Sequence, residues 1–137
     1  MNSDKSQLPR ELFTGVANLD QQHADLFATI QRIKAKLIEN RGRYPNDTLE
    51  FTALRQAMAV HFAWEEAAAS ECNIPFESHA REHQRLLAMM DRELQTLEGG
   101  STNLPALLVV FDRSFEMHVS RHDQTFGNKL RHCRESV

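Results

Sequence analysis

The sequence predicts an all-α protein: an up-down-up-down antiparallel four-helix bundle with an irregular N-terminal arm. Apolar side chains recur every three to four residues in four long segments, which is the spacing of a helix with one buried face. Glycine and proline stand between these segments and favour short connections. The strict alternation of apolar and polar residues that is typical of strands is absent from the sequence. Helices joined by short connections pack antiparallel to their chain neighbours, so the four should form one bundle.

A chain of 137 residues is long enough for one domain with its own core, without disulfides or metal to hold it together. We divide this single domain (1–137) into three parts. Residues 1–17 form the arm, residues 18–127 the four-helix bundle, and residues 128–137 a tail.

The first two helices are predicted from their apolar stripes and capping residues. Asn18 can cap the first helix. Its stripe consists of Leu19, His23, Leu26, Phe27, Ile30, Ile33 and Leu37. Residues 40–46 contain glycine and proline and form a connection. Asp47 and Glu50 have the spacing of a capping box for the second helix, which should end near Cys72. Its stripe consists of Phe51, Leu54, Met58, His61, Phe62 and Glu65.

The last two helices have the same kind of signals. Pro75 suits the first turn of the third helix, and a pair of glycines follows its end. Its stripe consists of Phe76, His79, His83, Leu86, Leu87, Met90, Leu94 and Leu97. Thr102 or Asn103 can cap the fourth helix. Its stripe consists of Leu108, Phe111, Phe115, His118, Val119 and Phe126. Gly127 is expected to end this helix and to leave only a short tail or a frayed turn.

Composition excludes several classes of function. The content of 41% hydrophobic and 26% charged residues is typical of a soluble globular protein. A net charge of -3 without a basic cluster predicts no nucleic-acid partner. The longest apolar run, residues 104–111, is interrupted by Pro105 and is too short to span a membrane. Residues 1–10 are polar and lack the apolar core of a signal peptide, so we expect a cytoplasmic protein.

The two cysteines, Cys72 and Cys133, are too few for a disulfide framework and suit a reducing compartment. Both fall at the same end of the predicted bundle. They belong to the second and fourth helices, however, which lie diagonally in such a bundle. We therefore expect free thiols rather than a redox switch.

Histidine and acidic residues concentrate on the inward stripes. His61 and Glu65 are four residues apart, and so are His79 and His83, which stacks each pair on one face of a helix. Counting from the connections places seven donors at one height: His23, His61, Glu65, His79, His83, His118 and Asp123. Buried carboxylates without cationic partners cost several kcal/mol each. No lysine or arginine lies on these stripes at that height, so the pattern predicts a metal site.

The spacing of His118 and Asp123 is not that of a regular helix. Five residues separate the two side chains by roughly 140° around the axis. On spacing alone His122, four residues from His118, would sit better on that face. The choice of Asp123 is what the resemblance described next implies, and it predicts a widened π-type turn that brings Asp123 to the face of His118. The alternative is a regular helix with His122 as the ligand. We interpret His122, and likewise Glu66, as exposed or as packed behind the ligands.

Four stretches resemble, in order and spacing, the signature of the hemerythrin family, and most closely its bacterial branch. They are 20–27 (DQQHADLF), 61–66 (HFAWEE), His79 with His83, and His118 with Asp123. The resemblance extends from about Phe13 to Phe126. It implies a non-haem di-iron site that binds O2 reversibly. It also implies that His79, His83 and His118 hold one iron, that His23 and His61 hold the other, and that Glu65 and Asp123 bridge them.

The implied cofactor is a pair of iron ions (Fe2+/Fe3+) with a bridging oxo or hydroxo group. With that bridge and two bridging carboxylates, the iron with three histidines is six-coordinate. The iron with two histidines keeps one open position, which is what O2 or another small diatomic ligand needs. The resemblance therefore implies a binding protein for oxygen storage, delivery or scavenging, and not an enzyme.

Two other functions remain open at this point. The chain could be a sensory domain that relays O2 or redox state to a signalling partner or an output domain. It could also be a di-iron enzyme that acts on peroxide or nitric oxide.

The sequence departs from the bacterial pattern at three positions outside the ligands. Ala69 stands where that pattern usually has methionine, Ser114 where it favours tryptophan, and Ile74 where it has tyrosine. The small side chain of Ala69 is expected to leave a void or a solvent channel beside the iron pair. We expect such a channel to speed oxidation to the ferric state.

Overall fold

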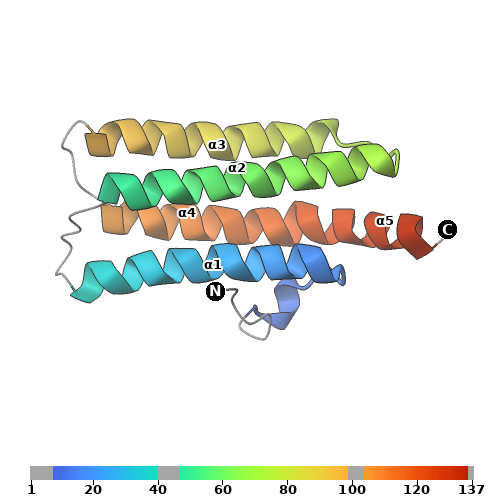
Figure 1. Cartoon of the computed structure of the whole chain (residues 1–137), viewed down its shortest axis with the longest axis horizontal. Coiled ribbons are helices and arrows are strands. Elements are labelled where there is room, and N and C mark those ends of the chain that lie inside the picture. The colour runs from blue at the N-terminus through green and yellow to red at the C-terminus, as the bar shows by residue number, and fades with distance from the viewer. Residues whose placement is uncertain (1–7, 40–46, 99–103, 136–137) are drawn as a thin grey trace.

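The computed structural model describes residues 8–39, 47–98 and 104–135, and within them the chain forms an antiparallel bundle of four long helices (Figure 1). These are α1 (Ala17–Glu39), α2 (Asp47–Glu71), α3 (Glu77–Glu98) and α4 (Leu104–His118). A π-helical segment, η3 (Val119–Asp123), and the helix α5 (Gln124–Glu135) continue α4. The predicted fold class is confirmed, and no strand occurs in the described residues.

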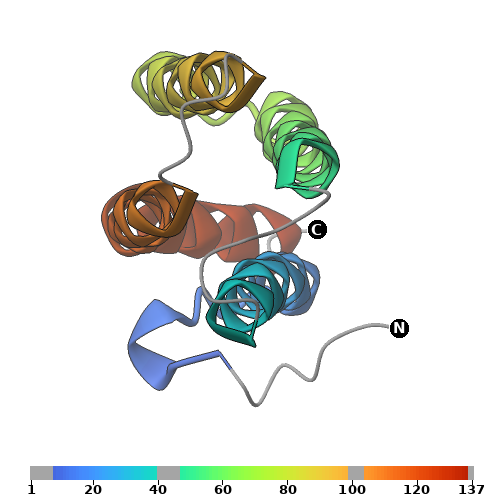
Figure 2. The same ribbon diagram turned by 90° about the vertical axis from the view of Figure 1, so that its left-hand side faces the viewer.

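No described helix is both long and apolar enough to cross a membrane. The four helices are arranged around a common interior when the bundle is viewed from its end (Figure 2). In this arrangement α2 lies diagonally opposite α4.

Two apolar clusters fill the interior. The larger one is built from the predicted stripes, and its fully buried side chains include Ile30, Phe51, Leu54, Met58, Leu86, Met90, Leu108 and Phe115. The smaller one lies toward the end of the bundle where α1 begins, and it consists of Val16, Leu19, Ala68, Ala69, Phe126 and Leu130. The polar residues singled out from the sequence lie between the two clusters.

The helix starts differ in detail from the predictions. α1 begins at Ala17, one residue before the expected cap Asn18. Thr14 is the residue that contacts this helix start: its Oγ1 accepts a hydrogen bond from the N–H of Val16, just before the helix, at 3.1 Å, and donates one to Asp20 in the first turn. The cap prediction at Asn18 is therefore wrong. The predicted caps Thr102 and Asn103, like the side chain of Asp47, lie outside the described residues. α3 begins at Glu77, two residues after Pro75.

The last helix is longer than predicted. Gly127 does not end it, and most of the predicted tail (128–137) is the helix α5, which continues to Glu135. The glycine serves close packing: a Cβ at Gly127 would lie 2.7 Å from Thr14 Cβ and 3.0 Å from its carbonyl oxygen. Seen from the end of the bundle, α5 leads away from α4 and crosses toward the side of α2 (Figure 2).

Cys72 and Cys133 form a disulfide, with their Cα atoms 6.0 Å apart. The prediction of free thiols is wrong, and the argument for a reducing compartment loses that support. Two helices on a diagonal do not touch along the bundle, but Cys72 follows the last residue of α2 and lies at the bundle end. Because α5 crosses that end, the diagonal does not keep the two sulfur atoms apart.

Candidate metal centre

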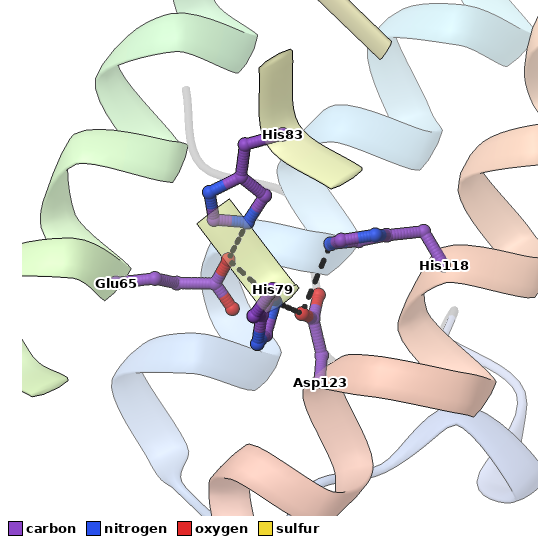
Figure 3. A group of neighbouring side chains, drawn as sticks. All are labelled: Glu65, His79, His83, His118 and Asp123. Carbon is purple, nitrogen blue, oxygen red and sulfur yellow. Dashed lines mark hydrogen bonds and ion pairs between the residues drawn. The ribbon is translucent and has the colours of Figure 1, made fainter. Parts of the chain in front are cut away.

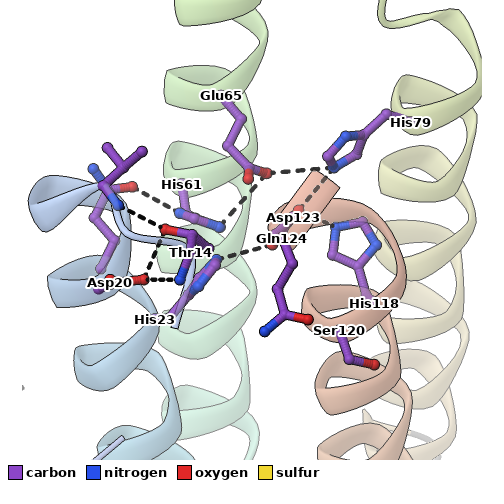
Figure 4. Close-up of polar contacts among 12 residues, drawn as sticks. Thr14, Asp20, His23, His61, Glu65, His79, His118, Ser120, Asp123 and Gln124 are labelled. Atoms are coloured by element: carbon purple, nitrogen blue, oxygen red, sulfur yellow. Dashed lines mark hydrogen bonds and ion pairs between the residues drawn. The ribbon is translucent and has the colours of Figure 1, made fainter. Parts of the chain in front are cut away.

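The seven predicted donors come from all four bundle helices and meet in the interior (Figures 3 and 4). α1 supplies His23, α2 supplies His61 and Glu65, α3 supplies His79 and His83, α4 supplies His118, and η3 supplies Asp123. All are buried, with exposed fractions from 0% to 8%. The structure thus brings together every residue that the height argument selected. Their binding of a metal ion stays a prediction at this point.

The donors form two overlapping sets, and within each set the ligand atoms lie within 4.8 Å of one another. The first set consists of Glu65, His79, His83, His118 and Asp123. The second set consists of His23, His61, Glu65 and Asp123. Both carboxylates belong to both sets, so they are placed where they could bridge two cations.

Asp123 lies at the centre of the cluster and contacts histidines from three helices (Figures 3 and 4). Its Oδ1 is 2.8 Å from His79 Nε2 and 3.2 Å from His118 Nε2. Its Oδ2 is 2.9 Å from His23 Nε2. Each oxygen of this carboxylate therefore faces a different donor set.

Glu65 faces the other side of the cluster. Its Oε1 lies 3.0 Å from His83 Nε2, 3.7 Å from His61 Nε2 and 3.8 Å from His79 Nε2. Together with the contacts of Asp123, these distances show that all five imidazoles present Nε2 to the carboxylates. A common orientation of this kind suits ligation at Nε2.

The predicted distortion of the fourth helix is confirmed. Val119–Asp123 is a π-helical segment, and it places Asp123 beside His118 although five residues separate them. His122 is half-buried and lies outside both donor sets. Its ring stacks on that of His118 with centroids 5.3 Å apart, and with Glu82 and His118 it forms a third, more exposed group. The interpretation of His122 as exposed or as packed behind the ligands stays a prediction, and its half-buried position beside His118 agrees with it.

Two polar side chains hold histidines from outside the cluster. Gln22 Oε1 lies 2.7 Å from Nδ1 of His61, and Glu66 Oε2 lies 3.3 Å from Nδ1 of His83. A partner on Nδ1 fixes the ring orientation and leaves Nε2 for a metal ion. The position of Glu66 behind a ligand matches its prediction. Gln22 was not singled out from the sequence, where its only signal is its place directly before His23.

The N-terminal arm packs against the segment that carries Asp123 (Figure 4). Gln124, the next residue, donates hydrogen bonds from Nε2 to the carbonyl oxygens of Glu11 and Phe13. Thr14 donates hydrogen bonds from its N–H and its Oγ1 to Asp20 Oδ1, both at 2.8 Å. The arm is thereby bonded to the first turn of α1 through Asp20 and to the start of α5 through Gln124.

The two carboxyl groups have opposite pKa shifts. Burial raises the pKa of Glu65 well above its usual value, and the nearby Asp123 carboxylate raises it further. Burial acts in the same direction on Asp123, but hydrogen bonds from His118, His23 and His79 outweigh it and hold the pKa of Asp123 well below its usual value. One carboxyl group of the metal-free site is therefore ionised, and the other tends to keep its proton.

Two of the histidines, His61 and His83, are held neutral. Burial and the neighbouring His23 lower the pKa of His61 to about 3. Burial, with His79 and His118 nearby, lowers the pKa of His83 to about 2. Metal ligation requires the neutral imidazole. These two rings are therefore ready to bind a cation well below neutral pH.

The unsatisfied polar atoms of the cluster fit a cation. Several buried atoms of the cluster have only a close imidazole–carboxylate contact and no fully aligned hydrogen bond: Nε2 of His23, His61, His83 and His118, both oxygens of Glu65, and Oδ2 of Asp123. Among the described residues, neither Glu65 nor Asp123 is paired with a lysine or arginine. Buried polar atoms in this state are costly unless a cation satisfies them, and imidazole with carboxylate is a donor set that iron accepts. The cluster therefore fits a metal-binding site.

Ala69 does not open the site to solvent as expected. Its side chain is 1% exposed and packs in the smaller apolar cluster with Leu19, Phe126 and Leu130. The longer last helix supplies Phe126 and Leu130, so the expected channel at this position is wrong. Two surface pockets instead reach the ligands on the side of α3 and α4. One, of about 240 Å³, reaches His79; the other, of about 380 Å³, is lined by Ser114 and reaches His118.

Comparison with known proteins gives one match. The family model described as the hemerythrin HHE cation binding domain matches residues 14–130. This range contains all seven donors, the smaller apolar cluster, and all of the larger cluster except Leu8 and Leu12. No curated protein and no solved structure matches the chain.

Proposed function

The chain belongs to the hemerythrin family, and on that premise we propose that its seven buried donors hold two iron ions that together bind O2 reversibly. The observation that supports the proposal is the pair of overlapping donor sets, with three histidines in one, two in the other and both carboxylates in common. An oxo or hydroxo bridge would complete the pair. When bound, the iron pair supplies the electrons that O2 takes up and gives back.

The residues have distinct roles in this proposal. His79, His83 and His118 hold the first ion, and His23 and His61 hold the second. Glu65 and Asp123 bridge the two ions. Because the second set offers one histidine fewer, its ion is the one with room for a small diatomic ligand.

The surroundings of the second set support a dry site. The ring of Phe115 lies edge-on to His23 and His61, with centroid distances of 5.9 Å and 6.4 Å. Phe27 packs on Phe115 from the other side, at 4.9 Å. An apolar wall of this kind limits the access of water to the metal. Because less water reaches the ions, their oxidation is slowed as well.

We further propose that the chain binds its ligand without chemical turnover, and that it acts in storage, delivery or scavenging of O2 in the cytoplasm. The cluster supplies ligands rather than a nucleophile or a base poised for a substrate. Neither a nucleic acid nor a membrane is among its proposed partners.

One observation favours a second candidate, a sensory domain. Gln124 follows Asp123 directly and holds the backbone of the arm at Glu11 and Phe13. A shift of Asp123 on ligand binding would therefore reach the arm, from which a signalling partner or an output domain could read it. The partner itself remains to be identified.

The test is the optical spectrum of iron-loaded protein, first reduced without oxygen, then exposed to air and returned to argon. We expect an oxygenated spectrum that disappears under argon and returns in air, with two iron ions per chain. H61L should lose this cycle, whereas H132A, which changes a surface histidine, should keep it. Absence of bound iron in the natural sequence would refute the proposal.

Other results of the same experiment select other functions. Sustained consumption of peroxide or nitric oxide would make the protein an enzyme. A change in the protease sensitivity of the arm on oxygenation, absent from Q124A, would favour the sensory domain.

A further inference from the structure

The disulfide joins the two chain segments that lead to the shared carboxylates. Cys72 directly follows α2, the helix that carries Glu65, and Cys133 belongs to α5, which directly follows Asp123. Because α2 and α4 lie diagonally in the bundle, the disulfide is a covalent link across the metal centre's end of the molecule (Figures 1 and 2). A change in this link would act on both sides of the site.

The same two segments line the pocket that reaches His79. Ile74 and Pro75 come from the connection after Cys72, and Phe126 and Lys129 come from α5. His79 also lines this pocket and is the most exposed of the seven donors, at 8%. The disulfide therefore ties together two segments that line a path between solvent and the donors.

Few other contacts hold the outer part of α5. Its buried residues are Phe126, Gly127 and Leu130, all in its first two turns. Beyond them, the Arg134 guanidinium lies over the Trp64 ring, 5.9 Å from its centroid. Both disulfide cysteines are half-buried rather than enclosed in the core. Without the disulfide, residues 131–135 would contribute no buried residue to the bundle, and the contacts left include the packing of the Arg131 side chain beside Gly15 and the contact of Arg134 with Trp64.

We propose that the Cys72–Cys133 disulfide is a redox switch that controls how fast metal leaves and reaches the centre. In the oxidised state, which the structure shows, the pocket that reaches His79 is held at its present size by this link between α5 and the connection. A dithiol reductant opens it: the reductant's thiolate attacks one sulfur, the S–S bond breaks, and two electrons and two protons pass to Cys72 and Cys133 while the dithiol becomes a disulfide. This inference rests on the proposed metal centre.

The experiment measures the release of ferrous iron to a coloured chelator, without oxygen, from oxidised and from dithiol-reduced protein. We expect release to be roughly tenfold faster after reduction, the size of effect that follows when the groups supporting metal ligands are disturbed. C72S, C133S and the double variant should all release iron at the fast rate. Addition of the dithiol to the double variant should change nothing, which separates the switch from chelation by the dithiol.

A second measurement does not depend on iron. Amide hydrogen exchange of metal-free protein should be faster in residues 124–135 after reduction, while α1 stays unchanged. If this difference appears but no iron is bound, the tether exists and the proposed function fails. Equal exchange and equal iron release in the two states would overturn the switch. So would two free thiols in air-exposed protein, counted by alkylation and mass spectrometry.

Discussion

At the scale of single residues, the Nδ1 atoms of the ligating histidines decide how firmly each ring is held. His61 and His83 have polar partners there, Gln22 and Glu66. The Nδ1 atoms of His23 and His118 are buried and have no hydrogen-bond partner in the structure. On the Nδ1 side these two rings are therefore held by packing, whereas a hydrogen bond to Nδ1 fixes His61 at the set with two histidines.

We predict that Q22L weakens metal binding at the set with two histidines by about 10- to 100-fold, because the ring of His61 loses the partner that orients it. Competition with a chelator of known affinity measures the change. Q21L is the matched control: Gln21 is the neighbouring residue and bonds to Asp25 instead of a ligand. Equal affinities of Q22L and Q21L would show that Gln22 does not support the site.

The raised pKa of Glu65 predicts proton release on metal binding. In the metal-free fold this carboxyl group tends to keep its proton at pH values where an exposed carboxyl group is ionised. A cation requires the carboxylate, so binding should release this proton, and metal affinity should rise with pH until the pKa of Glu65 is passed. His61, with a pKa of about 3, should not compete with metal above pH 5.

Calorimetric titration with zinc in buffers of different ionisation enthalpy measures the proton release. At pH 6 the natural sequence should release up to one proton more than E65Q, which has no titratable group at that position. Equal release from both proteins would contradict the raised pKa.

At this scale the sequence identifies the donors because helical spacing and height can be counted. It does not identify Gln22, since a hydrogen bond between neighbouring helices depends on the exact rotation of α1 against α2. The polar character of Gln22 is also that of any surface residue.

At the scale of elements, η3 solves the spacing problem between His118 and Asp123. A π-helical turn accommodates one more residue than an α-helical turn. The side chains before and after the turn therefore point in the same directions as in an α-helix without that extra residue. The distortion is predictable because two residues that are five positions apart do not lie on the same face of an α-helix.

This geometry predicts that deletion of Ser120, an exposed residue within η3, preserves metal binding. The turn should become α-helical and leave His118 and Asp123 four residues apart, on one face. Deletion of Glu116, an exposed residue of α4, should abolish binding, because it rotates both donors by about 100° relative to the preceding helix.

Metal content per chain after reconstitution measures both variants. Loss of metal from both deletions alike would show that the π-helical turn has a role beyond spacing.

α5 shows where prediction of elements from sequence fails. A glycine after an amphipathic segment is a reasonable stop signal, because glycine often ends helices. Here Gly127 is needed for a different reason, the close approach of Thr14, and that contact depends on tertiary structure. The four long helices were predictable because their stripes are long and regular.

At the scale of the whole molecule, the bundle concentrates buried polar groups that only a cation satisfies. The cost of these groups is offset by the apolar clusters on both sides. The chain should therefore fold without metal but gain stability from it.

We predict that removal of metal lowers the free energy of unfolding by about 4 kcal/mol relative to protein with free metal a thousandfold above its Kd. Urea unfolding of the metal-free and reloaded protein measures the difference. A variant without both carboxylates, E65L/D123L, should unfold at the same urea concentration with and without metal. If the natural sequence also unfolds at the same urea concentration with and without metal, the cluster binds no metal.

The fold and the site could be predicted at this scale because each follows from periodicity along single helices. The disulfide could not. It depends on α5 crossing the bundle end, and reasoning from an ideal bundle puts the two cysteines on helices that do not touch.

The attachment of the arm to Gln124 has a practical consequence for work on this protein. The hydrogen bonds to Glu11 and Phe13 sit one residue from a bridging carboxylate, so anything fused upstream of the arm pulls on that ligand. Purification tags and fluorescent fusions placed there would disturb colour, metal content and melting temperature together. The reverse is also useful: a reporter dye on the arm would register, by its own emission, the binding of a metal ion at the cluster.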